Sequence, residues 1–289
     1  MVALSGKNLF DASTQWATRP ADERFWTVEE MHQHCLEMKA SSREATVKMR
    51  SLGIHSEGEE LYTVGSTGIR AYFTNHSFGQ LSRSVEAPAG YLRSLPANMA
   101  AGALNHGIQS KLNGDHRNLL LRTVDDAAYR VSAFTTDKYD RIWDSEITER
   151  LVDLQGRGWR VPPARPSDAN DPRARKATSA DVLSDRDGFL SISVGDMIAP
   201  AGLYASDHDM FAFMVNEDKV INANGVPMKR GFFISNSEVG DKAFKVVWFL
   251  YSHVCSNHII WSVEDVKELR VVHRGKDGSA RNRAFEGLN

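Results

Sequence analysis

The sequence has little that would place the protein outside the cytoplasm. Its 289 residues include two cysteines, Cys35 and Cys255, which are too few for the disulfide framework of a secreted protein. No apolar run approaches the roughly 20 residues that a membrane-spanning helix needs. The first residues also lack the basic-then-apolar layout of a signal peptide. We therefore expect a cytoplasmic protein with no membrane partner.

The sequence also lacks an excess of charge of either sign. The 35 lysines and arginines nearly balance the 37 aspartates and glutamates, which gives a net charge of −2. This balance excludes a uniformly basic nucleic-acid coat but is compatible with a local basic groove. With 42% hydrophobic and 25% charged residues, the composition is that of ordinary globular proteins. The length suggests two ordinary domains or one large one.

Helical periodicity dominates the first part of the chain. A capping box, Thr27-x-x-Glu30, precedes apolar residues at helical spacing. Three further short helices are predicted between residues 77 and 112, separated at Pro88 and Pro96, because proline cannot continue a helix. The sequence therefore predicts a mainly helical region at 27–115.

Strand patterns dominate the later part. Two β-rich runs within 118–134 predict a hairpin, and a helix is expected from a cap at Asp144 to Gly156. Residues 189–194 are expected to form a strand, and the run 210–215 is apolar on both faces, as in an interior strand. Because strands and helices do not alternate regularly, an α+β fold is favoured. It would have an N-terminal helical region followed by an antiparallel, curved β-sheet packed with helices.

These patterns divide the chain into six parts. They are an N-terminal arm (1–26), the mainly helical region (27–115), the hairpin plus helix (116–155), a Pro/Arg-rich loop (156–180), a β-rich core that continues the same domain (181–275) and a basic tail (276–289).

The Pro/Arg-rich loop carries the most informative charge pattern. Guanidinium groups for phosphates beside an aromatic ring for bases are what sequence-independent single-strand binding uses. A solvated loop is the alternative, because runs of charge are usually solvated. The residues expected to bind single-stranded DNA are Arg157, Trp159, Arg160, Arg173, Arg175 and Lys176 in the loop, with Lys229, Arg230, Lys242 and Lys245 beside the sheet.

Two clusters offer chemistry of another kind. Asp207-His208-Asp209 could bind Mg²⁺ or supply an acid and a base, which keeps a metal-dependent, nuclease-like enzyme as an alternative. His253-x-Cys255-x-x-His258 has spacing that suits zinc but lacks further ligands, so core packing is favoured there. No metal and no cofactor are therefore expected.

A third interpretation concerns residues 77–95. Their rhythm is that of a helix-turn-helix, with Tyr91 and Arg93 on the second helix. Such a segment would make the protein a duplex-DNA-binding regulator. The turn glycine of that motif is absent, and groups of three helices are common packing units.

Four stretches of the sequence, taken together, resemble a known family. They are GLYASDHDMFAFM (202–214), RGFFISNSEVG (230–240), VCSNHIIW (254–261) and ELRVVHR (268–274). They resemble phage- and plasmid-encoded proteins catalogued as domain of unknown function 932. Looser similarity at 78–96 and 129–142 extends the resemblance over roughly residues 75–275.

The resemblance implies a mobile-element protein of the bacterial host cytoplasm, where handling nucleic acid is the commonest task. A looser analogy with phage single-strand annealing proteins implies a ring or filament of identical subunits that holds single strands in a basic groove. The expected function is therefore non-covalent binding of single-stranded DNA that promotes strand annealing in homologous recombination. A phage exonuclease is a candidate partner.

Overall fold

The computed structural model shows an α+β protein, which confirms the expected fold class. It describes residues 19–65, 68–125, 128–162, 164–184, 192–223, 225–251, 253–254, 260–261, 264–275 and 278–287. The chain divides into two compact units. Unit 1 comprises Met1–Leu36, Ile142–Val272 and Arg281–Asn289, and unit 2 comprises Glu37–Arg141 and His273–Ala280.

These units differ from the divisions that the sequence suggested. The region predicted as mainly helical contains four strands that sequence patterns missed, and its first strand pairs with the first strand of the 118–134 hairpin. The division at residue 115 therefore falls inside a single sheet. The four strands are β1 (Ser42–Lys48), β2 (His55–Glu57), β3 (Glu60–Val64) and β4 (Arg70–Phe73).

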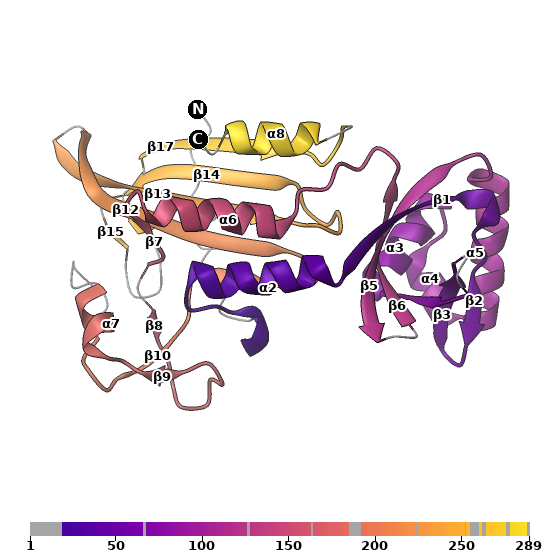
Figure 1. Ribbon diagram of the computed structural model, residues 1–289, viewed down its shortest axis with the longest axis horizontal. Helices are drawn as coiled ribbons and strands as arrows, with labels where there is room; N and C mark the ends of the chain where they lie inside the picture. Colours follow the sequence, from indigo (N-terminus) through magenta and orange to yellow (C-terminus); the bar gives the residue numbers. More distant parts are fainter. Residues whose placement is uncertain are drawn as a thin grey trace. The chain divides into compact units, whose positions relative to one another are not determined.

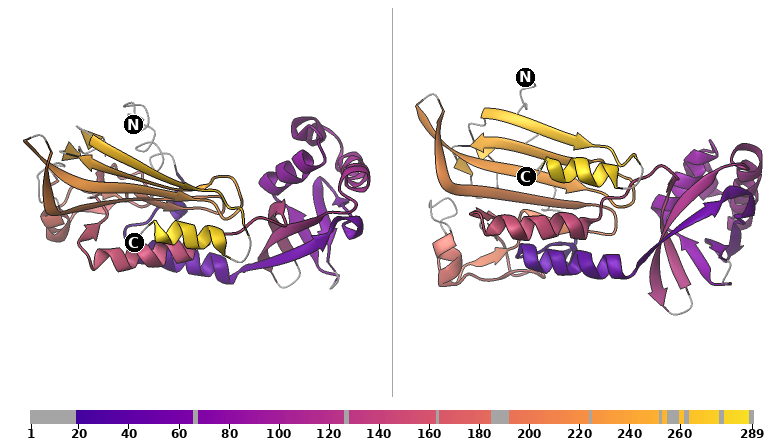
Figure 2. Two further views of the ribbon diagram at one scale, coloured as in Figure 1. Left: turned by 90° about the horizontal axis from the view of Figure 1, so that it is seen from above. Right: turned by 45° about the horizontal axis from the view of Figure 1, so that its top comes forward.

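Unit 1 is built on an antiparallel sheet in the order β11-β12-β13-β14-β17, with β7 (Trp159–Arg160) paired to β12. Figures 1 and 2 show three helices along one face of this sheet. The strands are β11 (Leu203–Ala205), β12 (Met210–Ala223), β13 (Val226–Asn236), β14 (Phe244–Tyr251) and β17 (Glu264–Val271), and the helices are α2 (Val28–Ala40), α6 (Asp144–Gln155) and α8 (Ser279–Glu286).

The expected interior strand is confirmed. β12 lies between β11 and β7 on one side and β13 on the other, and all its side chains from residue 210 to 215 are buried. Alternate residues of a strand point to opposite faces, so both faces of the sheet are covered here.

The sequence predicts the N-terminal cap of α2 correctly, but not that of α6. The Glu30 N–H donates to Thr27 Oγ1 at 3.1 Å, and Glu30 accepts from the Trp26 N–H at 2.8 Å. Asp144 was expected to cap α6, yet its backbone N–H donates to Glu238 and its carboxylate accepts from Asn236 Nδ2 at 2.7 Å. The start of α6 is therefore fixed by two side chains at the end of β13 and just after it.

The C-terminal segment, expected to be a basic tail, contains the helix α8. Asp140 supplies the N-terminal acceptor, because its Oδ2 accepts from the Ala280 N–H at 2.7 Å. Arg281 of this helix pairs with Glu146 of α6 at 3.0 Å. The sequence around residue 279 does not predict this helix, because the residue that caps it, Asp140, lies far away in the sequence.

The Pro/Arg-rich loop is more ordered than expected. It contributes to a three-stranded sheet in the order β8-β10-β9, which packs on a small core of Ala177, Ile192 and Ile198. Of the strand expected at 189–194, residues 189–191 lie outside the described residues and 192–194 are not in a strand. The remaining short elements of unit 1 are η1 (Ala21–Glu23), β8 (Arg165–Pro166), β9 (Arg175–Lys176), α7 (Ser179–Ser184), β10 (Met197–Ala199), β15 (His253–Val254) and β16 (Ile260–Trp261).

Unit 2 contains a six-stranded sheet in the order β1-β5-β6-β4-β3-β2, in which β4 and β6 run parallel and all other neighbours are antiparallel. Helices cover one of its faces (Figure 1). Pro88 and Pro96 separate the three helices, as predicted, and each is the N-cap of the helix that follows it. The further elements are η2 (Met49–Ser51), α3 (Asn75–Ser84), α4 (Ala89–Ser94), α5 (Ala97–Lys111), β5 (His116–Asp125) and β6 (Ala128–Thr136).

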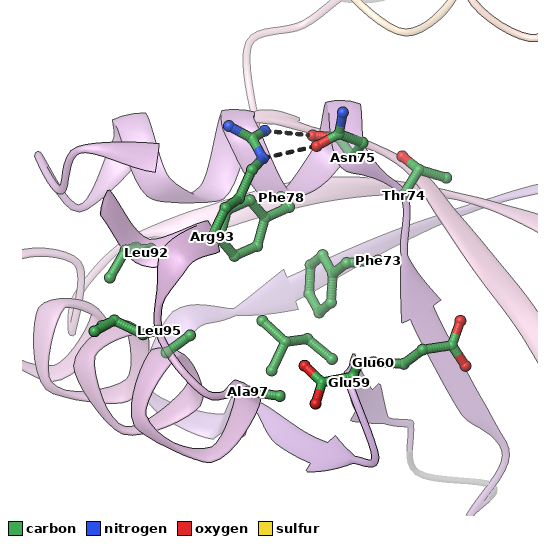
Figure 3. Close-up of a pocket in the computed structure, with 12 residues that line it drawn as sticks. Glu59, Glu60, Phe73, Thr74, Asn75, Phe78, Leu92, Arg93, Leu95 and Ala97 are labelled. Carbon is green, nitrogen blue, oxygen red and sulfur yellow. Dashed lines mark hydrogen bonds between the residues drawn. The ribbon is translucent and has the colours of Figure 1, made fainter. Parts of the chain in front are cut away.

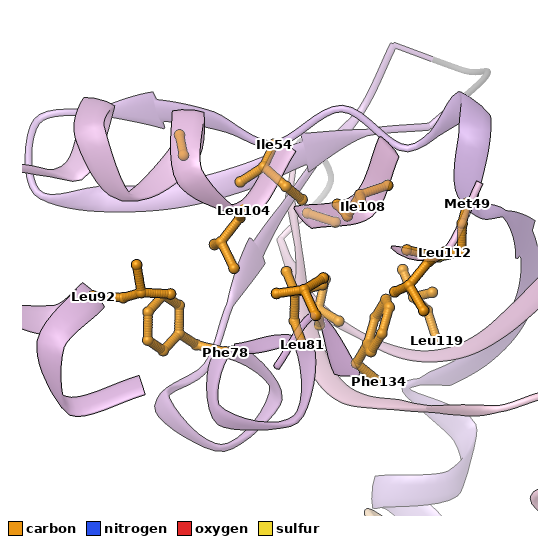
Figure 4. Packing of buried hydrophobic residues seen from close by; sticks show 14 residues of the cluster. Met49, Ile54, Phe78, Leu81, Leu92, Leu104, Ile108, Leu112, Leu119 and Phe134 are labelled. Atoms are coloured by element: carbon orange, nitrogen blue, oxygen red, sulfur yellow. The ribbon is translucent and has the colours of Figure 1, made fainter. Parts of the chain in front are cut away.

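The core of unit 2 lies between these helices and the sheet (Figure 4). Leu81 and Leu104 are fully buried between α3 and α5, and Leu119 and Phe134 reach them from β5 and β6. α3 and α5 approach closely at Gly107, where an added Cβ would lie 2.7 Å from Val85 Cβ.

Gly107→Ala is therefore expected to destabilise unit 2 by about 1–3 kcal/mol, because the added methyl overpacks this helix contact. The matched control is Gly102→Ala in the same helix, where nothing lies within 4 Å. There the usual gain of about 0.5–1 kcal/mol for alanine over glycine should be seen. Denaturant unfolding followed by circular dichroism gives both values, and equal effects of the two variants would contradict the close approach.

Candidate nucleic-acid interface

One row of side chains crosses most of the unit 2 sheet on the face opposite the helices, which we call the outer face. The strand register places these residues directly beside one another, from β5 to β2. We call this set the aromatic–basic row: Arg122, which is buried, Arg130, Tyr72, Tyr62 and His55.

Strand alternation explains why these residues share the outer face. In β3 and β4 the neighbours Leu61, Ala71 and Phe73 pack in the helix-covered core. Tyr62 and Tyr72 therefore point to the opposite face. The apolar neighbours fix the register, because a slip by one residue would move every core side chain out of the core.

The rings of the row lie in contact across the strands. The centroids of His55 and Tyr62 are 5.5 Å apart, as are those of Tyr62 and Tyr72, with tilted planes in both pairs. Both tyrosines are half-buried and His55 is exposed. Three rings on adjacent strands thus form a continuous aromatic surface.

Two arginines flank these rings, one paired with a carboxylate and one not. The Arg70 guanidinium lies 4.8 Å from the Tyr62 ring centroid and pairs with Glu57. The hydrogen bond from Arg70 lowers the pKa of Glu57, and a second one from the Tyr72 hydroxyl adds to this. Arg130 is exposed and forms no ion pair within the described part of the chain.

This arrangement suits a single-stranded nucleic acid. Unpaired bases stack on aromatic rings, and guanidinium groups contact the phosphates between them. A duplex hides the faces of its bases, so a flat aromatic surface on a sheet offers it little.

The ten residues expected to bind DNA are mostly committed to other contacts. Six of them pair with carboxylates, so each phosphate contact would have to replace an existing ion pair. These pairs are Arg160–Glu217, Arg173–Glu30, Arg175–Asp181, Lys229–Glu217, Lys242–Asp209 and Lys245–Glu268.

Trp159 and Arg230 are also engaged. The Trp159 ring is half-buried and packs against Phe232 with ring centroids 4.8 Å apart. The Arg230 guanidinium lies 5.7 Å from the Trp159 centroid. This indole belongs to the margin of the unit 1 core and is not a free stacking surface.

Arg157 and Lys176 differ from the other eight. Both are exposed, and neither side chain has an ion pair among the described residues. They are the two members of the expected set that could contact a phosphate without first breaking an ion pair.

The Asp207–Asp209 cluster does not form a metal site. Asp207 is exposed, whereas Asp209 is buried and accepts hydrogen bonds from Lys242 Nζ at 2.6 Å, the Tyr204 hydroxyl at 2.7 Å and Arg19 at 3.0 Å. Burial opposes ionisation, but these hydrogen bonds and the charges of Lys242 and Arg19 outweigh it and lower the pKa of Asp209. They occupy the carboxylate that a cation would need.

No group of three or more metal-ligating side chains is present among the described residues. Of the second candidate cluster, only His253 belongs to the described part of the chain. Cys255 and His258 lie outside the described residues, and His253 starts the two-residue strand β15.

The helix-turn-helix interpretation finds little support in the geometry. α4, the expected recognition helix, has six residues. Arg93 is turned toward α3, where its Nε donates to Asn75 Oδ1 at 2.7 Å and its guanidinium lies 5.0 Å from the Phe78 ring (Figure 3). These residues line a cavity of about 240 Å³.

No protein-family model matches this chain, and neither does any curated protein or solved structure. The resemblance to domain of unknown function 932 therefore stays a prediction. In the described part of the chain, no helix combines the length and apolar character needed to cross a bilayer.

Sequence reasoning missed the aromatic–basic row. The runs 60–64 and 70–73 are short and rich in β-formers, and glycines lie on both sides of the first run and before the second, which is a strand signal. That signal could have placed Tyr62 and Tyr72 on strands. Their position beside Arg130 depends on the parallel pairing of β4 with β6, which no local pattern reveals.

Proposed function

We propose that this protein binds single-stranded DNA through the outer face of the unit 2 sheet and thereby promotes strand annealing. The observation that carries the proposal is the aromatic–basic row, in which Tyr62 and Tyr72 stand between His55 and Arg130 on adjacent strands. The tyrosines would stack on bases, and Arg130 would contact the backbone phosphates.

Stacking on aromatic rings favours single strands over duplex. Base stacking on aromatic rings is tolerant of sequence because every base has a π-face. Annealing requires such tolerance, since complementary strands of any sequence must be held. Because the net charge is nearly neutral, DNA would bind at one local surface and not over the whole protein. Assembly into rings or filaments would then combine several weak binding contacts along one strand.

The two alternative functions are less well supported. A nuclease-like enzyme would use Asp209, but this carboxylate is held by Lys242 and Arg19. A duplex-reading helix would use Arg93, which is bonded to Asn75.

Fluorescence anisotropy with labelled oligonucleotides of about 30 nucleotides tests the proposal, since one binding module covers about 4–16 nucleotides. We expect binding to single strands of any sequence, weaker binding to duplex, and an affinity that falls as salt rises. Arg130→Gln should reduce the slope of log affinity against log salt by about 0.7, the value of one lost phosphate contact on a single strand.

Arg50→Gln is the charge-matched control, because Arg50 is exposed on η2 and outside the row. Absence of single-strand binding at low salt would overturn the proposal. Binding that depends on Arg157 and Lys176, and not on Arg130, would move the interface to unit 1.

A further inference from the structure

A second cavity of unit 2, of about 320 Å³, lies on the helix-covered side of the sheet, away from the aromatic–basic row. Its wall is largely apolar and includes Val47 of β1, Leu119 and Leu121 of β5, and Leu52. β1 and β3 are separated by three strands in the sheet order, yet both line the cavity. The sheet therefore curls around this space. Its volume falls at the lower end of the roughly 300–1,000 Å³ of small-molecule sites.

The first indication of a ligand is a buried hydroxyl. Thr63 lines the cavity, is 4% exposed, and its Oγ1 has no hydrogen-bond partner among the described residues. A buried polar group without a partner is unfavourable, and native proteins nearly always satisfy such groups. A polar atom of a bound molecule in the cavity would satisfy it.

The second indication is the charge at the rim. Arg43 lines the cavity, is exposed, and has no ion pair within the described part of the chain. The neighbouring Glu44 also lines the cavity, but its carboxylate is already paired, because it accepts from Arg141 Nε at 2.8 Å. The charge offered to a molecule in the cavity is therefore positive.

We propose that this cavity binds a small lipophilic carboxylate, of the class of medium-chain fatty acids. The apolar chain occupies the space between Val47, Leu52 and Leu121, and the Thr63 hydroxyl donates a hydrogen bond to the carboxylate. Arg43 pairs with the carboxylate at the rim, because a charge-assisted hydrogen bond there is stronger than a neutral one. This site is independent of the DNA-binding proposal, since its side chains lie on the opposite face.

Decanoate is the probe, with decanol and decylamine as matched molecules of the same chain length. Isothermal titration calorimetry gives affinity, and methyl NMR spectra of leucine and valine residues report the location. We expect one decanoate per chain, shifts of the Leu52, Val47 and Leu121 methyl groups, and at least tenfold weaker binding of decanol and decylamine.

Arg43→Gln should weaken decanoate binding by about tenfold and leave decanol binding unchanged, since it removes one charge-assisted contact. Thr63→Val keeps the volume, so a folded variant with about tenfold weaker binding is expected. Lys48→Gln, an exposed charge at the end of the same strand, is the control. No decanoate binding, equal binding of decanol and decanoate, or methyl shifts confined to other residues would each overturn the proposal.

Discussion

Replacing Tyr62 and Tyr72 with leucine should abolish most of the binding to single-stranded DNA. Each aromatic ring that stacks on a base contributes about 1–3 kcal/mol, which corresponds to roughly 5- to 150-fold in affinity. Leucine keeps an apolar side chain of similar size on the strand but offers no flat π-surface. The loss should be the same for all sequences, because stacking does not read base identity. Anisotropy titrations at a fixed low salt concentration measure it.

The design of this test separates stacking from folding. Tyr91→Leu is the matched control, because Tyr91 is 63% exposed on α4 and outside the aromatic–basic row. Its affinity should equal that of the unchanged protein. Thermal unfolding must show the double variant to be folded. An unchanged affinity in a folded Tyr62/Tyr72 double variant would refute the row as the stacking surface.

Local signals predicted the helices α2 to α6, but not α7 and α8. The capping box at Thr27 and the prolines at 88 and 96 can be recognised from a few neighbouring residues. In the structure a helix begins directly after each of them. The apolar run at 210–215 predicted a strand covered on both faces for the same reason. Each of these features depends on neighbours in the sequence.

Non-local pairing explains what the sequence did not predict. The strands β2, β3 and β4 have three to five residues each, and the pairing that joins them to the rest of the sheet is that of β4 with β6, more than 50 residues later in the chain. The sequence shows the arginines of 156–180 but does not show which carboxylates they pair with. Arg160 pairs with Glu217 and Arg173 with Glu30. A basic stretch thus predicts charge, while the distant carboxylates decide whether that charge is available.

Asp171→Asn is expected to destabilise unit 1 by about 3 kcal/mol at pH 7, because it breaks a buried ion pair. Asp171 accepts from both terminal nitrogens of Arg24, at 2.7 and 2.9 Å, and from Arg165 at 3.1 Å. Arg24 is 4% exposed, so its charge would remain buried beside a neutral amide. This contact ties the Pro/Arg-rich segment to the chain that precedes α2.

The stabilisation that Asp171 provides should also depend on pH. Hydrogen bonds from Arg24 hold the pKa of Asp171 well below its usual range, and the Arg173 N–H adds to this. A carboxyl whose pKa is lower in the folded state stabilises the fold above its unfolded pKa of about 3.9. That contribution is lost as the pH falls toward the folded pKa. The difference between the unchanged protein and Asp171→Asn should therefore shrink below about pH 4.

Urea unfolding at pH 7 and at about pH 3, followed by tryptophan fluorescence, measures both effects. All six tryptophans lie in the sequence segments of unit 1, so the signal reports that unit. Asp168→Asn removes the same charge three residues away at an exposed position and should change stability by less than about 0.5 kcal/mol. Equal losses in the two variants would mean that net charge is responsible. A loss for Asp171→Asn that persists undiminished at pH 3 would mean that the packing of this side chain, and not its ionisation, holds the segment in place.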